Sequence, residues 1–140
     1  IQGRAPSAVL MALISDPSLD TWVATWTFSE TIHSRSYTHI MRNLYTDPSK
    51  VFDEIVLDEA IMKRAESIGK YYDDVLVKTR YWENAKESVE LAKESPDADF
   101  RLNRAIKQEA EAKRALMKSL YLCLHVINAL EAIRFYVSFA

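Results

Sequence analysis

The sequence has few of the residues that interrupt regular structure, with two glycines and four prolines in 140 residues. Ala, Leu, Glu, Lys and Arg, which are strong helix formers, are abundant instead. This composition favours an all-α fold. The length is that of one ordinary domain and is sufficient to bury a core.

Only one cysteine, Cys123, is present, so an internal disulfide is excluded. No signal peptide precedes Ile1, and we expect a reducing, cytoplasmic location. Cys123 lies in the apolar run Leu120–Leu124, where a free cysteine usually acts as a small hydrophobic residue. We therefore predict a core position for it and no catalytic role.

An excess of basic residues is also lacking. Lys and Arg number 18 against 20 Asp and Glu, which gives a net charge of -2. A protein that grips phosphates normally carries a basic patch or stripe. Nucleic acid is therefore excluded as an expected partner.

Three dipeptides place a good N-cap residue before a proline at the first helical position. Each should open a helix: Asp16-Pro17, Asp47-Pro48 and Ser95-Pro96. With Asp58 as a further cap, helices are predicted over 17–43, 48–56, 59–82 and from 99 through 140. The polar stretch 83–117 is predicted to be a solvated helical excursion within one partial domain, 1–140.

Two of these helices have apolar residues at helical spacing, which predicts a buried face on each. In the first, these are Leu19, Trp22, Val23, Trp26, Ile40, Met41 and Leu44. In the third, the inner stripe is Ile61, Ala65, Ile68, Tyr72 and Val75.

Residues 120–140 are apolar enough to resemble a membrane span by length. Four polar residues would be costly in hydrocarbon: His125, Asn128, Glu131 and Arg134. A helix in the centre of a bundle could pair them. We predict a core helix and no membrane contact.

Glu30-x-x-His33 is followed four residues later by Tyr37, so all three share the stripe assigned to the core. A buried carboxylate is costly unless it is paired, and a metal ion would pair it. Helical bundles build two-metal sites from Glu and Glu-x-x-His on facing helices. Taken alone, Glu-x-x-His is a weak signal for metal, because a charged helix often contains it by accident and an exposed ion pair explains it.

Glu131 is the one acidic residue between Lys118 and Ala140. A buried acid in such apolar surroundings needs a partner, which a metal ion could be. A salt bridge to Arg134 is the alternative.

Two long motifs now carry a resemblance: Ser29–Ile40 (SETIHSRSYTHI) and Asn128–Phe139 (NALEAIRFYVSF). Together with Ile1–Arg4 and Leu120–Leu124, they resemble the small, radical-generating subunit of class I ribonucleotide reductase. The resemblance implies a ferritin-like helical bundle. The 83–117 region departs from it.

The resemblance implies that Glu30 bridges two irons, that His33 binds the first and Glu131 the second, and that Tyr37 is the radical site formed with oxygen. Further implied roles are a radical pocket of Ile133, Phe135 and Phe139 and a hydrogen bond from Trp26 to a ligand carboxylate. His39 and His125 belong to neither set and are predicted to be structural. The sequence His33–Tyr37 resembles the class Ia form of the subunit, which favours iron over manganese.

The family pattern further implies a large catalytic subunit as partner and a homodimer. It also has an aspartate before Ile1 and a second Glu-x-x-His after Ala140, so we expect a bundle truncated at both ends and inactive alone. Two alternatives stay open. One is another ferritin-like diiron oxygenase, desaturase or storage protein; the other is a non-catalytic helical interaction module.

Overall fold

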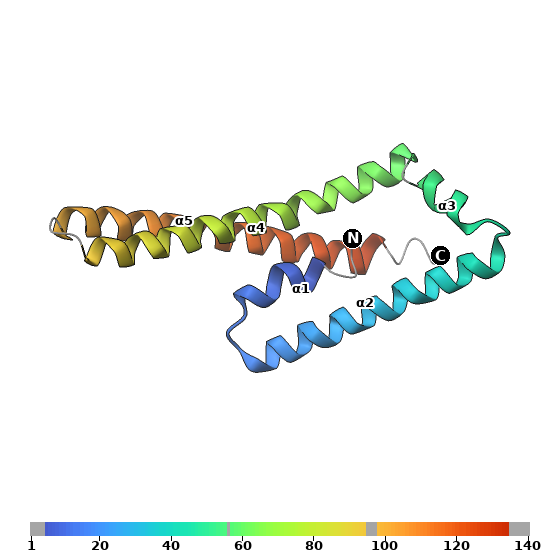
Figure 1. The fold of residues 1–140 in the computed structure, drawn as a ribbon, viewed down its shortest axis with the longest axis horizontal. Helices are drawn as coiled ribbons and strands as arrows, with labels where there is room; N and C mark the ends of the chain where they lie inside the picture. Colours follow the sequence, from blue (N-terminus) through green and yellow to red (C-terminus); the bar gives the residue numbers. More distant parts are fainter. Residues whose placement is uncertain (1–4, 56, 95–97, 135–140) are drawn as a thin grey trace. The chain divides into compact units, whose positions relative to one another are not determined.

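The computed structural model describes residues 5–55, 57–94 and 98–134. Within these ranges the side chains of residues 5, 6, 55, 98 and 134 are not described. Every regular element in the described ranges is helical. The predicted all-α class is confirmed, and the helical content of the described residues is consistent with a ferritin-like helical bundle (Figure 1).

The helices follow one another with short connections. In chain order they are α1 (Ala5–Leu10), a 3-10 turn (Met11–Leu13), α2 (Pro17–Leu44), α3 (Pro48–Ile55), α4 (Glu59–Lys93), α5 (Ala98–Ala129) and a π-helical turn (Leu130–Arg134).

The predicted caps open the helices. The Asp16 carboxylate accepts hydrogen bonds from the backbone N–H groups of Ser18 (2.7 Å) and Leu19 (3.1 Å), with Pro17 in the first helical position. These bonds satisfy N–H groups that have no partner within the helix. Asp47 does the same for Ser49 and Lys50 at the start of α3, and Asp58 accepts from Ile61 at the start of α4. Ser95-Pro96 lies outside the described residues.

The predicted boundary at Trp82 is wrong, because α4 continues to Lys93 without a break. The helix predicted for the polar residues between Trp82 and Ser95-Pro96 is confirmed as part of α4. The residues after Trp82 are polar but are themselves good helix formers, and no breaker occurs before Ser95-Pro96. Polarity marked solvent exposure here and not the end of a helix. The last predicted helix also departs from regular α geometry, since it changes to a π-helical turn at Leu130.

The chain divides into two compact units, 1–69 and 70–140. In the first unit α1 packs against α2, and Val9, Leu10 and Val23 are buried. The predicted burial of the whole apolar face of α2 is wrong for this chain by itself, since Trp22 is 57% and Leu44 71% exposed. A helix of 28 residues is about 42 Å long, whereas the six residues of α1 span about 9 Å.

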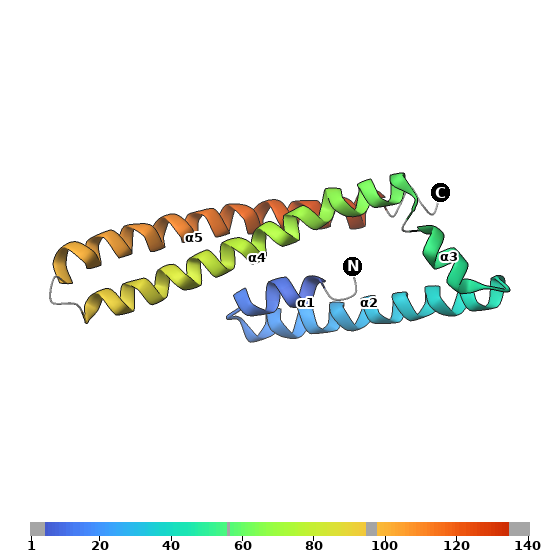
Figure 2. The same ribbon diagram turned by 45° about the horizontal axis from the view of Figure 1, so that its top comes forward.

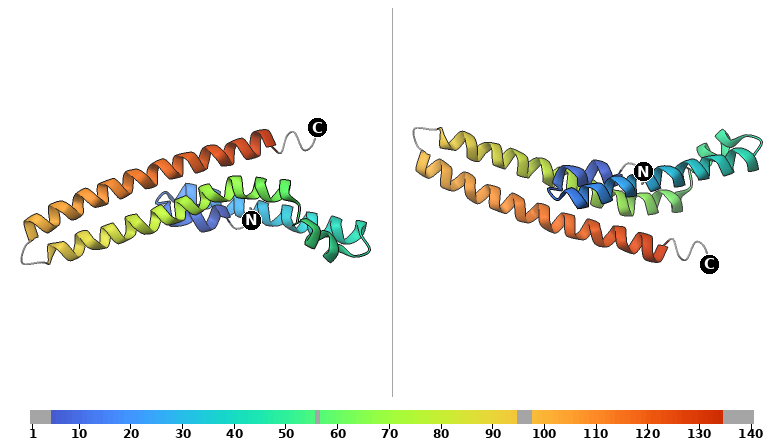
Figure 3. Two further views of the ribbon diagram at one scale, coloured as in Figure 1. Left: turned by 90° about the horizontal axis from the view of Figure 1, so that it is seen from above. Right: turned by 90° about the horizontal axis from the view of Figure 1, so that it is seen from below.

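In the second unit, residues 70–93 of α4 lie antiparallel beside α5, as all views show (Figures 1, 2 and 3). Most of the less exposed residues of α5 and the π turn recur alternately three and four apart, the spacing of a coiled-coil contact. We call this series the α5 seam: Leu102, Ala105, Glu109, Ala112, Leu116, Ser119, Cys123, Val126 and Leu130. Half-buried Leu120 and buried Ile127 lie beside the series. The α4 seam is Tyr72, Val75, Thr79, Trp82, Ala85, Val89 and Ala92.

Cys123 lies at the centre of this second unit, fully buried, as does Val75 on α4. The predicted core position of Cys123 is therefore confirmed. Burial raises the pKa of its thiol from 9.0 to about 11, because the charged thiolate loses its hydration there. The thiol is thus poorly suited to act as a nucleophile.

One helical stretch among the described residues, Asp99–Ile133, is long and apolar enough to cross a membrane by length and composition. Core helices of soluble proteins meet the same criterion, so this is weak evidence for a span. The same stretch carries His125, Asn128 and Glu131. A core helix stays our prediction.

Candidate metal centre

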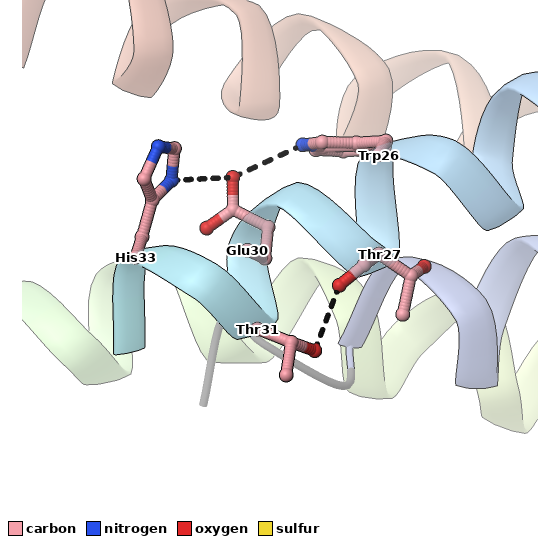
Figure 4. Close-up of polar contacts among 5 residues, drawn as sticks. All are labelled: Trp26, Thr27, Glu30, Thr31 and His33. Atoms are coloured by element: carbon pink, nitrogen blue, oxygen red, sulfur yellow. Dashed lines mark hydrogen bonds and ion pairs between the residues drawn. The ribbon is translucent and has the colours of Figure 1, made fainter. Parts of the chain in front are cut away.

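Trp26, Glu30 and His33 meet on one face of α2, and Figure 4 shows them side by side. The Trp26 Nε1–H donates a hydrogen bond to Glu30 Oε1 at 3.2 Å. His33 Nδ1 lies 3.8 Å from the same oxygen. Residues three and four apart on a helix are neighbours, so this gathering follows from the sequence spacing. The hydrogen bond expected from Trp26 to a candidate ligand carboxylate is thus present.

The Glu30 side chain is 15% exposed, whereas that of His33 is 61% exposed. The carboxylate is therefore largely removed from water while the imidazole remains accessible. A charged acid in such a place needs a partner. Here one indole N–H donates a hydrogen bond to Glu30 Oε1, and one imidazole nitrogen lies near the same oxygen. In Figure 4 both dashed contacts end on the same oxygen, and none reaches the second oxygen, Oε2.

Threonines on other faces of α2 do not compete for Glu30. Thr27 Oγ1 donates to the Val23 carbonyl at 2.8 Å. Thr31 Oγ1 donates to the Thr27 carbonyl at 2.9 Å, as Figure 4 shows. Both hydroxyls are thus satisfied by backbone carbonyls of their own helix.

The donor set suits a metal such as iron. A carboxylate with one uncommitted oxygen and an accessible imidazole are the ligands that iron-type sites use, and both come from one helical face. The ion pair that the sequence left open is also present in the geometry, since the two groups lie within 4 Å of one another. That contact carries charge on both sides only when His33 is protonated.

Tyr37 lies one turn beyond His33 on the same helix, as predicted, and is 56% exposed in this chain. Its neighbour on that stripe, Ile40, is 47% exposed. The described residues of the first unit therefore leave the phenol without the dry surroundings that a stored radical needs.

Glu131 belongs to the second unit and lies in the π-helical turn Leu130–Arg134, where it is exposed. π-Helical turns are rare and frequently occur at functional sites. Ile133 is 62% exposed, while Phe135 and Phe139 lie outside the described residues. Among the described residues, no group of three or more His, Cys, Asp and Glu side chains gathers as a possible metal site.

Comparison with known proteins places the whole chain in one group. It is 84% identical over 144 aligned residues to ribonucleoside-diphosphate reductase subunit beta of Enterobacteria phage T4, which covers 100% of this chain and 35% of that protein. It is 54% identical to ribonucleoside-diphosphate reductase 1 subunit beta of Escherichia coli O157:H7 and 51% to the subunit beta of Haemophilus influenzae, covering 100% of this chain and 34% of each relative. No protein-family model matches.

The chain belongs to the ribonucleoside-diphosphate reductase beta-subunit family. It spans about a third of the length of the curated relatives that it matches. The resemblance predicted from Ser29–Ile40 and Asn128–Phe139 is thereby confirmed at the level of the family. The individual site roles in this beta-subunit segment stay predictions.

Two polar contacts in this beta-subunit segment were missed by the sequence analysis. Trp82 Nε1–H donates to Glu109 Oε1 at 3.1 Å, and the Ser119 hydroxyl donates to Asp74 Oδ2 at 2.5 Å. Each joins α4 to α5. Their signal in the sequence is that Glu109 and Ser119 occupy positions of an otherwise apolar three-and-four series, which a pattern of apolar residues alone passes over.

Proposed function

We propose that the intact protein is the radical-generating small subunit of a ribonucleoside-diphosphate reductase, which serves deoxyribonucleotide synthesis. The observation that supports this most strongly is the 84% identity to a named beta subunit along the whole chain. The pairing of Trp26, Glu30 and His33 on one face of α2 supports it independently.

Two iron ions would be held by Glu30, His33 and Glu131 together with donors from the rest of the protein. With oxygen, such a centre supplies the one-electron oxidant that a phenol requires. Iron is favoured over manganese because the sequence His33-Ser-Arg-Ser-Tyr37 resembles the class Ia form.

Trp26 and His33 prepare Glu30 for this role. The indole N–H holds Oε1 in place, so that the carboxylate keeps one orientation and Oε2 is left for a second contact. A ligand held in this way loses less freedom when a metal binds. His33, on the accessible side, would contribute an imidazole nitrogen.

Tyr37 would give up one electron and the proton on its Oη and keep the resulting neutral radical. Its place one helical turn beyond His33 puts it on the ligand-bearing stripe of α2. Ile133, Phe135 and Phe139 would exclude water from the phenol, because a radical survives only where reductants cannot reach it.

The nucleotide would be reduced elsewhere, on a large catalytic subunit that draws on the radical. The intact small subunit is proposed to be a homodimer in the cytoplasm, with neither nucleic acid nor membrane as a partner. The net charge of -2 agrees with the absence of a nucleic-acid surface.

Electron paramagnetic resonance of the intact protein after addition of ferrous iron and oxygen tests the proposal. We expect a sharp tyrosyl signal that disappears in Tyr37→Phe at unchanged iron content. Tyr45→Phe, at the C-cap of the same helix, is the matched control and should retain the signal. Iron without any radical would favour an oxygenase or storage protein, and absence of bound iron would favour a structural module.

A further inference from the structure

Two polar contacts join α4 to α5: Trp82 and Glu109 both belong to the seams, whereas Ser119 of the α5 seam bonds to exposed Asp74 beside the α4 seam. The first is a clasp of four residues: Trp82 donates to Glu109 at 3.1 Å, while Lys86 Nζ lies 4.0 Å and Lys113 Nζ 5.9 Å from the centroid of the indole ring. The positive charge of each lysine is attracted by the negative face of the indole ring. The half-buried indole and carboxylate therefore satisfy each other, with two cations beside them.

The second contact lies earlier on α4 and later on α5 than the first. Ser119, only 4% exposed, donates its hydroxyl proton to Asp74 Oδ2 at 2.5 Å, and Lys78 Nζ lies 3.8 Å from the other oxygen of Asp74. Trp82 follows Asp74 by eight residues on α4, and Glu109 precedes Ser119 by ten on α5. Opposite order and similar spacing mean that a single antiparallel alignment forms both contacts.

The apolar residues do not define this alignment by themselves. The α5 seam repeats every three or four residues, and around Glu109 it contains the small side chains of Ala105 and Ala112. If α5 slipped along α4 by one seam position, that is by three or four residues, one of these alanines would lie opposite Trp82. Neither alanine side chain can accept a hydrogen bond from the indole. The same slip would replace Ser119 by Leu116 or Cys123. Polar groups inside a coiled-coil contact commonly set its register in this way.

We infer that the residues of the clasp and of the Asp74–Ser119 contact fix the axial position of Glu131 relative to α4. This inference rests on the proposed function of Glu131 as a metal ligand. Glu131 follows Glu109 by 22 residues, about 33 Å along a helix that transmits axial displacement. The π turn that carries Glu131 begins at Leu130, the last residue of the α5 seam. A slip of one step would move Glu131 by about 5 Å relative to residues 70–93 of α4. Metal–oxygen distances of roughly 2 Å do not tolerate such a shift.

The test uses the intact protein with spin labels at two exposed positions, Glu87→Cys on α4 and Lys107→Cys on α5. Fully buried Cys123 should stay unlabelled. In the metal-free protein we expect one narrow distance between the labels. In the double variant Glu109→Ala/Ser119→Ala the distance distribution should broaden or its maximum should shift, and iron affinity should fall at least tenfold. Glu111→Ala, on an exposed position of the same helix, should change neither.

Glu109→Gln provides rescue and guards against a folding artefact, because it keeps the oxygen that accepts the indole hydrogen bond. It should retain the narrow label distance and iron affinity within about threefold of the unaltered protein. An unchanged label distance in the double variant overturns the inference. So does a shifted distance with unchanged iron affinity. If the unaltered protein binds no iron, the proposed function fails, and so does the inferred role of the two contacts in positioning Glu131. The label distance still shows whether the two contacts set the alignment of α4 and α5.

Discussion

At the scale of single residues, the centre of interest is a carboxylate held by two ring systems. Glu30 accepts from Trp26 and faces His33 with the same oxygen. Trp26 is itself stacked at a tilt on Trp22, with ring centroids 5.4 Å apart. Trp26 therefore contacts both Trp22 through its ring and Glu30 through its N–H.

Trp26→Phe should weaken iron binding by the intact protein, because the ring remains while the hydrogen bond to Glu30 is lost. Loss of such an outer partner typically costs 10- to 100-fold in metal affinity. Competition with a chromophoric chelator measures it. Trp22→Phe, which removes an indole N–H but no bond to Glu30, should stay within about threefold. Equal affinities for the two variants would contradict this role of Trp26.

Cys123 predicts a stability change in alkali. Its pKa is about 11 in the folded chain against 9.0 when exposed, so the unfolded state loses its proton first as the pH rises. The stabilisation is complete below pH 9 and is lost between pH 9 and 11. Two pKa units correspond to about 3 kcal/mol of unfolding free energy. Denaturant titrations at pH 8 and 11 should show this loss, and Cys123→Ala should lack it. Parallel losses in both proteins would refute the assignment.

At the scale of the helices, the N-caps determine where each begins. Asp16→Ala should lower the free energy of unfolding by about 1 kcal/mol, because the N–H groups of Ser18 and Leu19 lose their acceptor. Asp16→Asn should lose only a few tenths of that. Denaturant midpoints of the intact protein measure both. Asp20→Ala, within the first turn of α2 but outside the cap, is the control; an effect as large as that of Asp16→Ala would argue against capping.

The same scale explains which helix ends could be predicted. Asp-Pro and Ser-Pro dipeptides have a local effect, so the starts of α2 and α3 followed from a few residues. The end of α4 did not, because the change from apolar to polar at Trp82 alters the surroundings of a helix and not its backbone preference. The π turn at Leu130 has no local sequence rule that would reveal it.

At the scale of the whole molecule, much apolar surface of this chain is uncovered. Trp22, Phe28 and Tyr37 on α2 are each more than half exposed, and so is Tyr121 on α5. The relatives are about three times as long as the segment they share with this chain. We therefore expect the dry site around Tyr37 to need further parts of the protein.

The 140-residue chain with the large subunit should accordingly yield no measurable deoxyribonucleotide, because the resemblance supplies only Glu30, His33 and Glu131 of six expected ligands. Radiolabelled ribonucleotide reduction measures this, with the intact small subunit as positive control. Product above the level of the large subunit alone would refute the prediction. The same chain should also show no tyrosyl radical signal after iron and oxygen.

The sequence by itself determined the helical class, the capped helix starts, the gathering of Trp26, Glu30 and His33 and the family, because each depends on contacts within a few residues or on long identical motifs. Only the tertiary structure decided that α4 extends to Lys93, that the face of α2 is open in this chain, and that Trp82 and Ser119 bond across to Glu109 and Asp74. The physical reason is that burial and register arise between segments distant in the chain, where residue spacing alone gives no distance.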